Sequence, residues 1–157
     1  MSKGFVVAEQ GHVVQMLAPV AITAALTGDT ISMEAWGHAS IIVGFGVGSA
    51  TTITVGECTG FGGTGRTAIT FRSAQEATGG GDVLDAALAW ASTITIAGSA
   101  AHVGGFAVIE IDADELSDGY NFLQVNVADP GTSKLGCIYA ILSGGRYQKD
   151  ITATVIA

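Results

Sequence analysis

Short runs of apolar and β-branched residues recur along the chain, and each is followed by a few residues rich in glycine, aspartate or proline. In three of these runs, over residues 52–55, 69–72 and 123–127, apolar and polar residues alternate one by one. Such alternation is typical of a strand that buries one face and wets the other. The pattern predicts about nine short antiparallel strands, over residues 20–23, 30–33, 40–47, 51–57, 67–73, 93–97, 106–111, 122–128 and 135–142.

Helical patterns are scarce. Residues 82–91 begin with an aspartate suited to capping and predict one short helix, and residues 112–116 predict a single helical turn. Residues 1–17 have little strand character and are assigned to an N-terminal arm, while residues 18–157 are assigned to a single domain. Many short strands joined by tight turns favour an all-β fold, an antiparallel β-sandwich of the jelly-roll kind.

The amino-acid composition supports an all-β chain and indicates which kinds of partner it binds. Ile, Val and Thr number 44 among 157 residues, against 17 for Leu, Glu and Lys, and branched side chains fit strands better than helices. The formal net charge is −8, with only 6 basic residues, so we expect no nucleic acid as partner. Because 48% of the residues are hydrophobic and 13% are charged, we expect a homo-oligomer whose interfaces cover the apolar surplus.

Two long uncharged runs, between residues 34 and 57 and between residues 85 and 110, raise the question of a membrane span. A spanning helix needs about 20 mainly apolar residues, whereas glycine and polar residues interrupt both runs. At the start of the chain the continuous apolar stretch before Glu9 is only four residues long, shorter than the ~7–15 residues of a secretory signal. We therefore expect a protein that is neither membrane-bound nor secreted.

The loop from Gly60 to Thr67 is the strongest candidate for chemistry. It contains Gly-x-Gly-x-x-Gly and nearly matches the phosphate-binding motif Gly-x-x-x-x-Gly-Lys-[Ser/Thr], which implies a nucleotide-binding enzyme. However, Arg66 stands where the motif's lysine would reach the phosphates, and residues 67–72 alternate like a strand, whereas the motif must open a helix. We interpret the loop as a turn between strands; a helix beginning at Arg66 would reverse this interpretation.

Four carboxylates lie within seven residues, at Asp112, Asp114, Glu115 and Asp118. Ca²⁺ takes about 6–8 oxygen ligands of this kind. Their spacing is not that of the helix–loop–helix calcium motif, and a solvated turn explains the cluster equally well. Ion binding by these four residues therefore stays open.

The remaining candidate groups are dispersed. His12, His38 and His102 lack the spacing of a metal-binding helix, and no Gly-x-Ser-x-Gly motif is present, although a Ser–His–Asp site requires only proximity in space. Cys58 and Cys137 are interpreted as small buried apolar side chains. Aromatic residues are the ingredients of a sugar-stacking platform but pack more commonly in a core or interface; they include Trp36, Trp90, Tyr120, Tyr139 and Tyr147.

We therefore assign no catalytic, cofactor-binding or metal-binding residue, and we expect no enzyme. Two segments instead resemble a known family: residues 108–127, which begin Val-Ile-Glu-Ile-Asp-Ala-Asp-Glu-Leu, and residues 140–147, Ala-Ile-Leu-Ser-Gly-Gly-Arg-Tyr. With residues 28–30 and 36–39, they resemble small head-associated decoration, or cement, proteins of tailed bacteriophages. The resemblance extends from about residue 19 onward and transfers no functional residue to this chain.

The resemblance implies a jelly-roll-type β fold, often trimeric, attached to the outside of a capsid. It implies a structural virion protein that binds the major capsid protein lattice and stabilises it, because a ligand of the assembled state alone shifts the equilibrium toward assembly. It also implies synthesis in the host cytoplasm and a place on the virion surface. The alternative is a virion binding module for a receptor or carbohydrate. A broad apolar face without a pocket would favour the capsid role, and residues converging on one pocket would favour the module.

Overall fold

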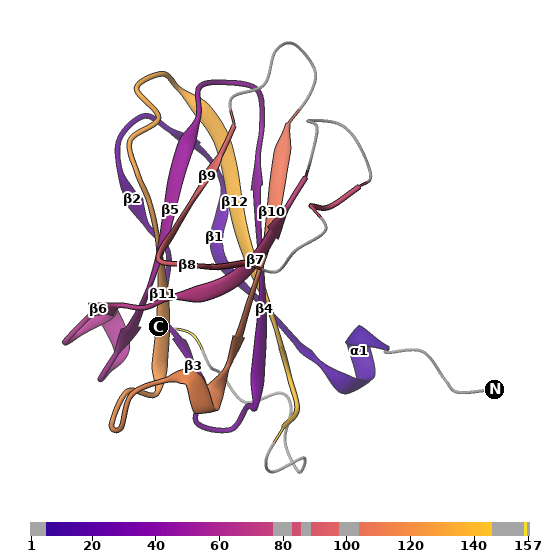
Figure 1. Cartoon of the computed structure of the whole chain (residues 1–157), viewed down its shortest axis with the longest axis vertical. Coiled ribbons are helices and arrows are strands. Elements are labelled where there is room, and N and C mark those ends of the chain that lie inside the picture. Colours follow the sequence, from indigo (N-terminus) through magenta and orange to yellow (C-terminus); the bar gives the residue numbers. More distant parts are fainter. Residues whose placement is uncertain (1–5, 77–82, 86–88, 98–103, 146–155, 157) are drawn as a thin grey trace.

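The computed structural model describes residues 6–76, 83–85, 89–97, 104–145 and 156. These residues form two antiparallel sheets that lie face to face as a sandwich (Figure 1). The all-β sandwich predicted from the sequence is therefore confirmed.

Each sheet brings together strands that are distant in the sequence. Sheet A consists, in spatial order, of β1 (His12–Ile22), β12 (Lys134–Ser143), β4 (His38–Phe45), β10 (Gly105–Asp112), β7 (Phe71–Gln75) and β8 (Ala89–Ala91). Sheet B has the order β2 (Leu26–Thr27), β11 (Phe122–Val127), β5 (Thr51–Cys58) and β6 (Thr67–Ala68); in addition β3 (Ile31–Ser32) pairs with β11, and β9 (Thr93–Ile96) pairs with β5.

Helix in the described residues is limited to α1 (Val7–Gln10) and two short 3₁₀ turns, η1 (Phe61–Gly63) and η2 (Ala113–Glu115). The turn predicted over residues 112–116 is confirmed by η2, where the backbone N–H of Asp112 donates to the Glu115 carboxylate at 3.0 Å. None of the helices in these ranges has the length and apolarity that crossing a membrane requires.

The helix predicted over residues 82–91 is wrong where the structure describes it. Residues 89–91 form β8 and pair with β7, and Leu84 makes an antiparallel bridge to Glu76. Hydrogen bonding to a neighbouring strand thus outweighs the local capping signal at the start of this segment. Residues 82 and 86–88 lie outside the described residues.

Two other boundaries differ from the prediction. Residues 12–17, assigned to an arm, belong to β1 and pair with β12, with irregular register on either side of Leu17. Such irregularities break the alternation that marks a strand, which explains why the sequence pattern missed this one. The single strand predicted over residues 67–73 is divided between sheets, because β6 pairs with β5 of sheet B and β7 pairs with β10 of sheet A.

The core lies between the sheets and is built from the inward side chains of both. In β4 and β10, buried and half-buried residues alternate along the whole strand, as the period of a strand requires. Burial of a single Val, Leu or Ile side chain contributes roughly 1.5–3 kcal/mol. The inward residues include Ile41, Val43, Ile109, Ile111, Ile138 and Leu142 from sheet A and Ile53, Val55, Leu123, Val125 and Val127 from sheet B.

Candidate functional site

The outer face of sheet A has a polar end and an apolar end. Along β4, the outward residues change from His38 and Ser40 to Ile42 and Gly44. The neighbouring strand β10 follows the same division, since Ser40 pairs with Glu110 whereas Ile42 pairs with Val108. On the other side of β4, β12 is apolar beside both ends, because Ile141 pairs with Ser40 and Tyr139 pairs with Ile42. The half-buried or exposed apolar residues of this face include Val13, Ile42, Phe106, Val108, Leu135, Cys137, Tyr139 and Ile141.

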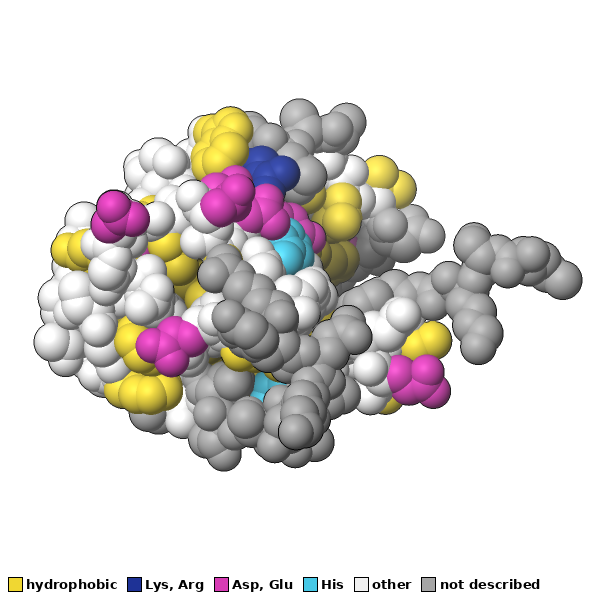
Figure 2. Space-filling view, turned by 90° about the horizontal axis from the view of Figure 1, so that it is seen from below, with side chains coloured by type: hydrophobic (Ala, Val, Ile, Leu, Met, Phe, Trp, Pro, Cys, Tyr) yellow, Lys and Arg dark blue, Asp and Glu magenta, His cyan; other side chains and the backbone are white. Residues whose placement is uncertain are grey.

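The polar end is a network of charged side chains that joins β4 to β10. The imidazole of His38 lies between two carboxylates, with Nδ1 2.6 Å from Asp112 Oδ1 and Nε2 2.7 Å from Glu110 Oε2. The hydroxyl of Ser40 also donates to Glu110, at 2.7 Å. In the view of Figure 2, basic, acidic and histidine side chains lie against one another on one side of the molecule.

Two further strands join this network through Arg72 of β7. Its Nη2 donates to Asp112 Oδ2 at 2.6 Å and lies 3.3 Å from Glu115 Oε1. The guanidinium also lies 5.6 Å from the ring centre of Trp90 on the edge strand β8, a cation–π contact. The network therefore crosses four neighbouring strands, from β4 to β8.

The charges of the network shift two pKa values in opposite directions. Burial lowers the pKa of His38, but hydrogen bonds and charges from Asp112 and Glu110 outweigh burial and raise it above its ordinary value of 6.5. The hydrogen bond from His38, together with the charges of His38 and Arg72, lowers the pKa of Asp112 despite its desolvation. Each shift favours the charged form of the group.

His38, Ser40 and Asp112 are the residue types of a Ser–His–Asp triad, but their arrangement does not activate the serine. A triad needs a neutral imidazole nitrogen that accepts the serine proton. Here Ser40 Oγ is 3.3 Å from His38 Nε2, and the hydroxyl donates instead to Glu110. The two carboxylates raise the pKa of His38 and so favour its protonated form, and the network links neighbouring strands of sheet A through their side chains.

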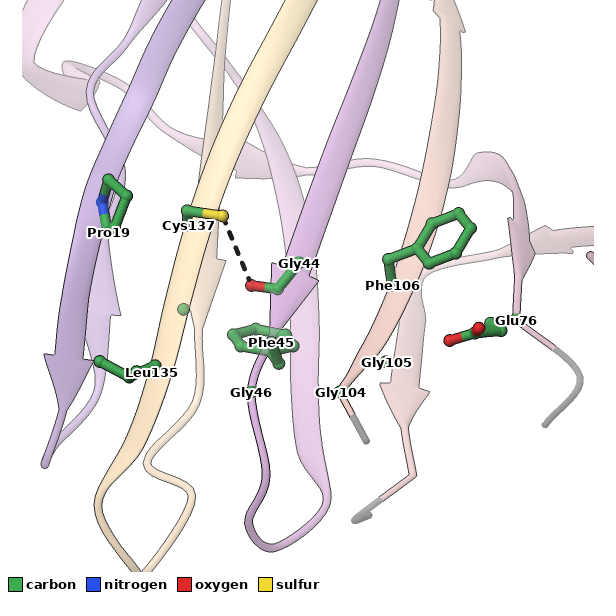
Figure 3. Close-up of a pocket in the computed structure, with 11 residues that line it drawn as sticks. Pro19, Gly44, Phe45, Gly46, Glu76, Gly104, Gly105, Phe106, Leu135 and Cys137 are labelled. Atoms are coloured by element: carbon green, nitrogen blue, oxygen red, sulfur yellow. Dashed lines mark hydrogen bonds between the residues drawn. The ribbon is translucent and has the colours of Figure 1, made fainter. Parts of the chain in front are cut away.

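The apolar end contains a groove of about 470 Å³ that crosses β12, β4 and β10 (Figure 3). Gly44 lies in the middle of it, paired with Cys137 of β12 on one side and with Phe106 of β10 on the other. The walls are apolar and include Pro19 and Leu135. Together these residues form a concave, apolar surface. Because Gly44 has no side chain, the surface is hollow at its centre.

One carboxylate, that of Glu76, lies at the β7 side of the groove. Figure 3 shows it directed toward β10, and the backbone N–H of Glu76 donates to the carbonyl of Phe106 at 3.0 Å, which fixes its position. Glu76 is half-buried, and its carboxylate forms no ion pair with any described residue. The groove therefore combines apolar walls with one available negative charge.

The structure separates the four carboxylates that the sequence grouped for Ca²⁺. Asp112 and Glu115 face Arg72, whereas Asp114 and Asp118 are exposed. Over the described ranges, no three His, Cys, Asp or Glu side chains are arranged to hold a metal ion. The nearness of these residues in sequence thus reflects the turn at η2, where two of them support β10.

The remaining candidates do not converge on one place. His12 packs against Trp36 with ring centres 5.8 Å apart, and Trp36 is itself in the core. Trp90 is exposed at the β8 edge, while Tyr139 on β12 accepts a hydrogen bond from Gln15 at 2.9 Å. Tyr120 precedes β11 in sheet B, and His102 and Tyr147 lie outside the described residues.

The glycine loop leads into a strand. Thr67 begins β6 and pairs with Glu57 of β5, so the helix that a phosphate-binding loop must open is not there. Arg66 lies over sheet B instead of the loop, with Nη2 3.3 Å from Thr54 Oγ1. The nucleotide-binding interpretation of residues 60–67 is therefore abandoned.

Both cysteines are free. Cys58 is fully buried, as predicted, but Cys137 is only half-buried and lines the groove. Sequence reasoning missed the groove and the His38 network. The available signals were the i, i+2 pairs His38 with Ser40 and Glu110 with Asp112, which share one face of a strand.

The sequence matches no protein-family model and no curated protein. Among solved structures, the chain is similar to the crystal structure of the SPBc2 prophage-derived protein YomS, with a TM-score of 0.51 and 10% sequence identity. The alignment covers 85% of this chain and 93% of that chain. At this level of identity the similarity shows that the two chains share a fold.

Proposed function

We propose that this chain is a structural virion protein of the capsid-decoration type, which binds the outside of an assembled phage head and stabilises it. One observation carries the proposal: at its apolar end the outer face of sheet A groups exposed and half-buried apolar side chains around Gly44, whereas the outer face of sheet B presents threonines and amides, among them Thr52, Thr54 and Asn126. An apolar region on the outer face of one sheet is suited to contact with another protein surface.

Two further points support a role in a phage particle. The structural neighbour is described as prophage-derived, and the sequence resembles head-associated proteins of tailed phages. In this proposal the chain stabilises the head by mass action, because it binds the assembled lattice and not its separated subunits.

Electron microscopy of particles made from the genome that encodes the chain tests the proposal. We expect the chain to copurify with heads and to give density on their outer surface. Heads made without its gene should lack that density and should open at a lower temperature. Recovery of the chain from the lysate but not from heads would overturn the proposal.

We also propose that the chain forms homo-oligomers, with the trimer expected from the family resemblance. Apolar side chains outside the groove, such as Val13 and Val20, are at least 38% exposed in the isolated chain, and subunit contacts commonly cover such surface. Light scattering coupled to size exclusion should give a multiple of 15.8 kDa. A mass of one chain that does not change on concentration would contradict this expectation.

The second candidate function is a virion binding module for a receptor or carbohydrate, and the groove over Gly44 is the observation that favours it. The same micrographs separate the two candidates. Density on a tail fibre or tail tip, together with saturable binding of host glycans, would favour the module over capsid decoration.

A further inference from the structure

We propose that the groove over Gly44 holds a segment of the head lattice, with an apolar side chain seated over Gly44 and a Lys or Arg paired with Glu76. This assignment rests on the proposed function and names the chemistry of the partner at that surface. It follows from the shape of the groove, its charge and the contacts of the basic residues that the structure describes.

The shape fits a side chain from another molecule. The groove of about 470 Å³ lies within the range of roughly 300–1,000 Å³ that is typical of binding pockets. A Cβ added at Gly44 would lie 3.4 Å from Cys137 Sγ, with no other atom of the described residues within 4 Å. The space above Gly44 is therefore open, and Phe106 and Leu135 provide apolar walls for an inserted group.

The charge fits a cation. Glu76 is the single acidic residue among those that line the groove, and it lacks an ion-pair partner in the described part of the chain. A carboxylate at the rim of an apolar surface favours a partner in which a basic residue adjoins an apolar one. The net charge of −8 adds long-range attraction to such a partner.

A second copy of the chain is a poorer occupant. The basic residues that the structure describes are already engaged: Arg66 with Thr54, Arg72 with Asp112, and Lys134 with the backbone carbonyl of Ser49 at 2.8 Å. None of these three is available to pair with Glu76 of another copy. We therefore assign the groove to the lattice.

The test is cosedimentation with purified heads made without this chain's gene. Gly44→Leu fills the groove, and Thr52→Leu places the same side chain at an outward position of β5 in sheet B. Glu76→Lys reverses the charge at the groove. As a control, Asp118→Lys makes the same change of charge at an exposed turn that does not line the groove. Thermal unfolding of every variant shows whether it has folded.

We expect Gly44→Leu and Glu76→Lys to weaken head binding at least tenfold, and the two controls to bind like the wild type. The effect of Glu76→Lys should shrink as salt rises toward about 1 M, where exposed charges are screened over roughly 3 Å. Unchanged binding by Gly44→Leu would overturn the assignment while leaving capsid decoration intact. Failure of the wild type to bind heads would overturn the proposed function itself.

Chemical modification of Cys137 gives a test that does not depend on folding of a variant. A maleimide added to the folded protein fills the groove from the β12 side, since Cys137 lines it and Cys58 is buried. We expect the modified protein to lose head binding and bound heads to protect Cys137 from the reagent. Cys137→Ser, treated in the same way, should still bind. Dissociation of a homo-oligomer by the reagent, with head binding unchanged, would assign the groove to a second copy instead.

Discussion

Each sheet has a glycine on the outer face of a central strand, Gly44 on β4 and Gly56 on β5, and the two are covered differently. At Gly56 an added Cβ would lie 2.6 Å from Nε of Arg66, so the arginine side chain occupies the space above the glycine. At Gly44 the space is open, and the nearest side-chain atom would be 3.4 Å away. One sheet covers its glycine with its own chain, and the other leaves it uncovered.

The two glycines reflect how far each outer face is covered by side chains of the same chain. On the outer face of sheet B, polar side chains form hydrogen bonds with one another. Thr52 and Thr95 form a hydrogen bond at 3.2 Å, and Arg66 reaches from its loop to Thr54. The apolar end of sheet A has no comparable cover among the described residues. A glycine beneath an arginine is a packing feature, whereas a glycine in an open apolar row is a recess for another molecule.

The largest expected difference concerns the two cysteines, one on each sheet. Cys137 is half-buried, whereas Cys58 is fully buried and burial raises the pKa of its thiol. Cys58 must wait for the structure to open, and each 1.4 kcal/mol of opening slows it about tenfold. We expect Cys137 to react with a maleimide roughly 1,000-fold faster, measured by mass spectrometry of digests. Equal reaction rates for Cys58 and Cys137 would show that Cys58 is as accessible to the reagent as Cys137, which would contradict its burial in the folded protein.

Substitution of each glycine by alanine should change the free energy of unfolding by different amounts on the two sheets. Gly56→Ala forces the Arg66 side chain away and should destabilise the fold by about 1–3 kcal/mol, as overpacking does. Gly44→Ala meets only an ordinary contact and should stay within about 0.5 kcal/mol of the wild type. Urea unfolding measures both changes. A loss at Gly44 as large as that at Gly56 would contradict the open space above β4.

Removal of the cover itself should have a smaller effect. Arg66→Ala deletes the side-chain stem over Gly56 and the contact with Thr54, and should cost about 1 kcal/mol through lost packing. The double variant Arg66→Ala with Gly56→Ala should be more stable than the sum of the single changes predicts, because the clash is gone. Strict additivity of the two changes would show that Arg66 does not cover the glycine.

The smallest effect is a pH dependence at the polar end of sheet A. Because the pKa of His38 is raised in the folded state, its stabilisation is fully present below the ordinary value of 6.5 and is lost as pH rises through the folded pKa. The difference in unfolding free energy between wild type and His38→Gln should fall across that window by at most about 1 kcal/mol. A difference that rises with pH would contradict the assigned protonation.

Asp112 acts in the opposite direction. Its lowered pKa gives a stabilisation that is present above the ordinary value of 3.8 and is lost as pH falls through the folded pKa. The network is therefore most stabilising between the two transitions, and Asp112→Asn should reduce the acid-side loss.

Alternation along the chain predicted most of the fold, since β5, β10, β11 and β12 lie within a residue or two of their expected bounds. It missed residues 12–19 of β1, where the register breaks near Leu17. It also joined β6 to β7, because the four alternating residues 69–72 hide a crossing between sheets. The local sequence pattern predicts which residues of a strand are buried, but it does not predict which strands pair with one another.

The site was harder to predict for the same reason. His38 and Glu110 are 72 residues apart, and only the antiparallel register of β4 and β10 brings them together. Gly44 is one glycine among 23, and its neighbours Cys137 and Phe106 come from two other strands. A recess produced by a missing side chain leaves no signal in a sequence until the register is known.

The position of β12 inside sheet A has a consequence for how the chain folds. This strand lies between β1 and β4, yet it is synthesised after the other strands that the structure describes. Pairing of His12 with Leu142 joins residues from opposite ends of the sequence, and contacts of such high order slow folding because a long loop must close first. During translation, the edges of β1 and β4 that pair with β12 therefore stay unpaired until β12 leaves the ribosome. Sheet A can be completed only after that point, and chaperones would act on the chain in that interval.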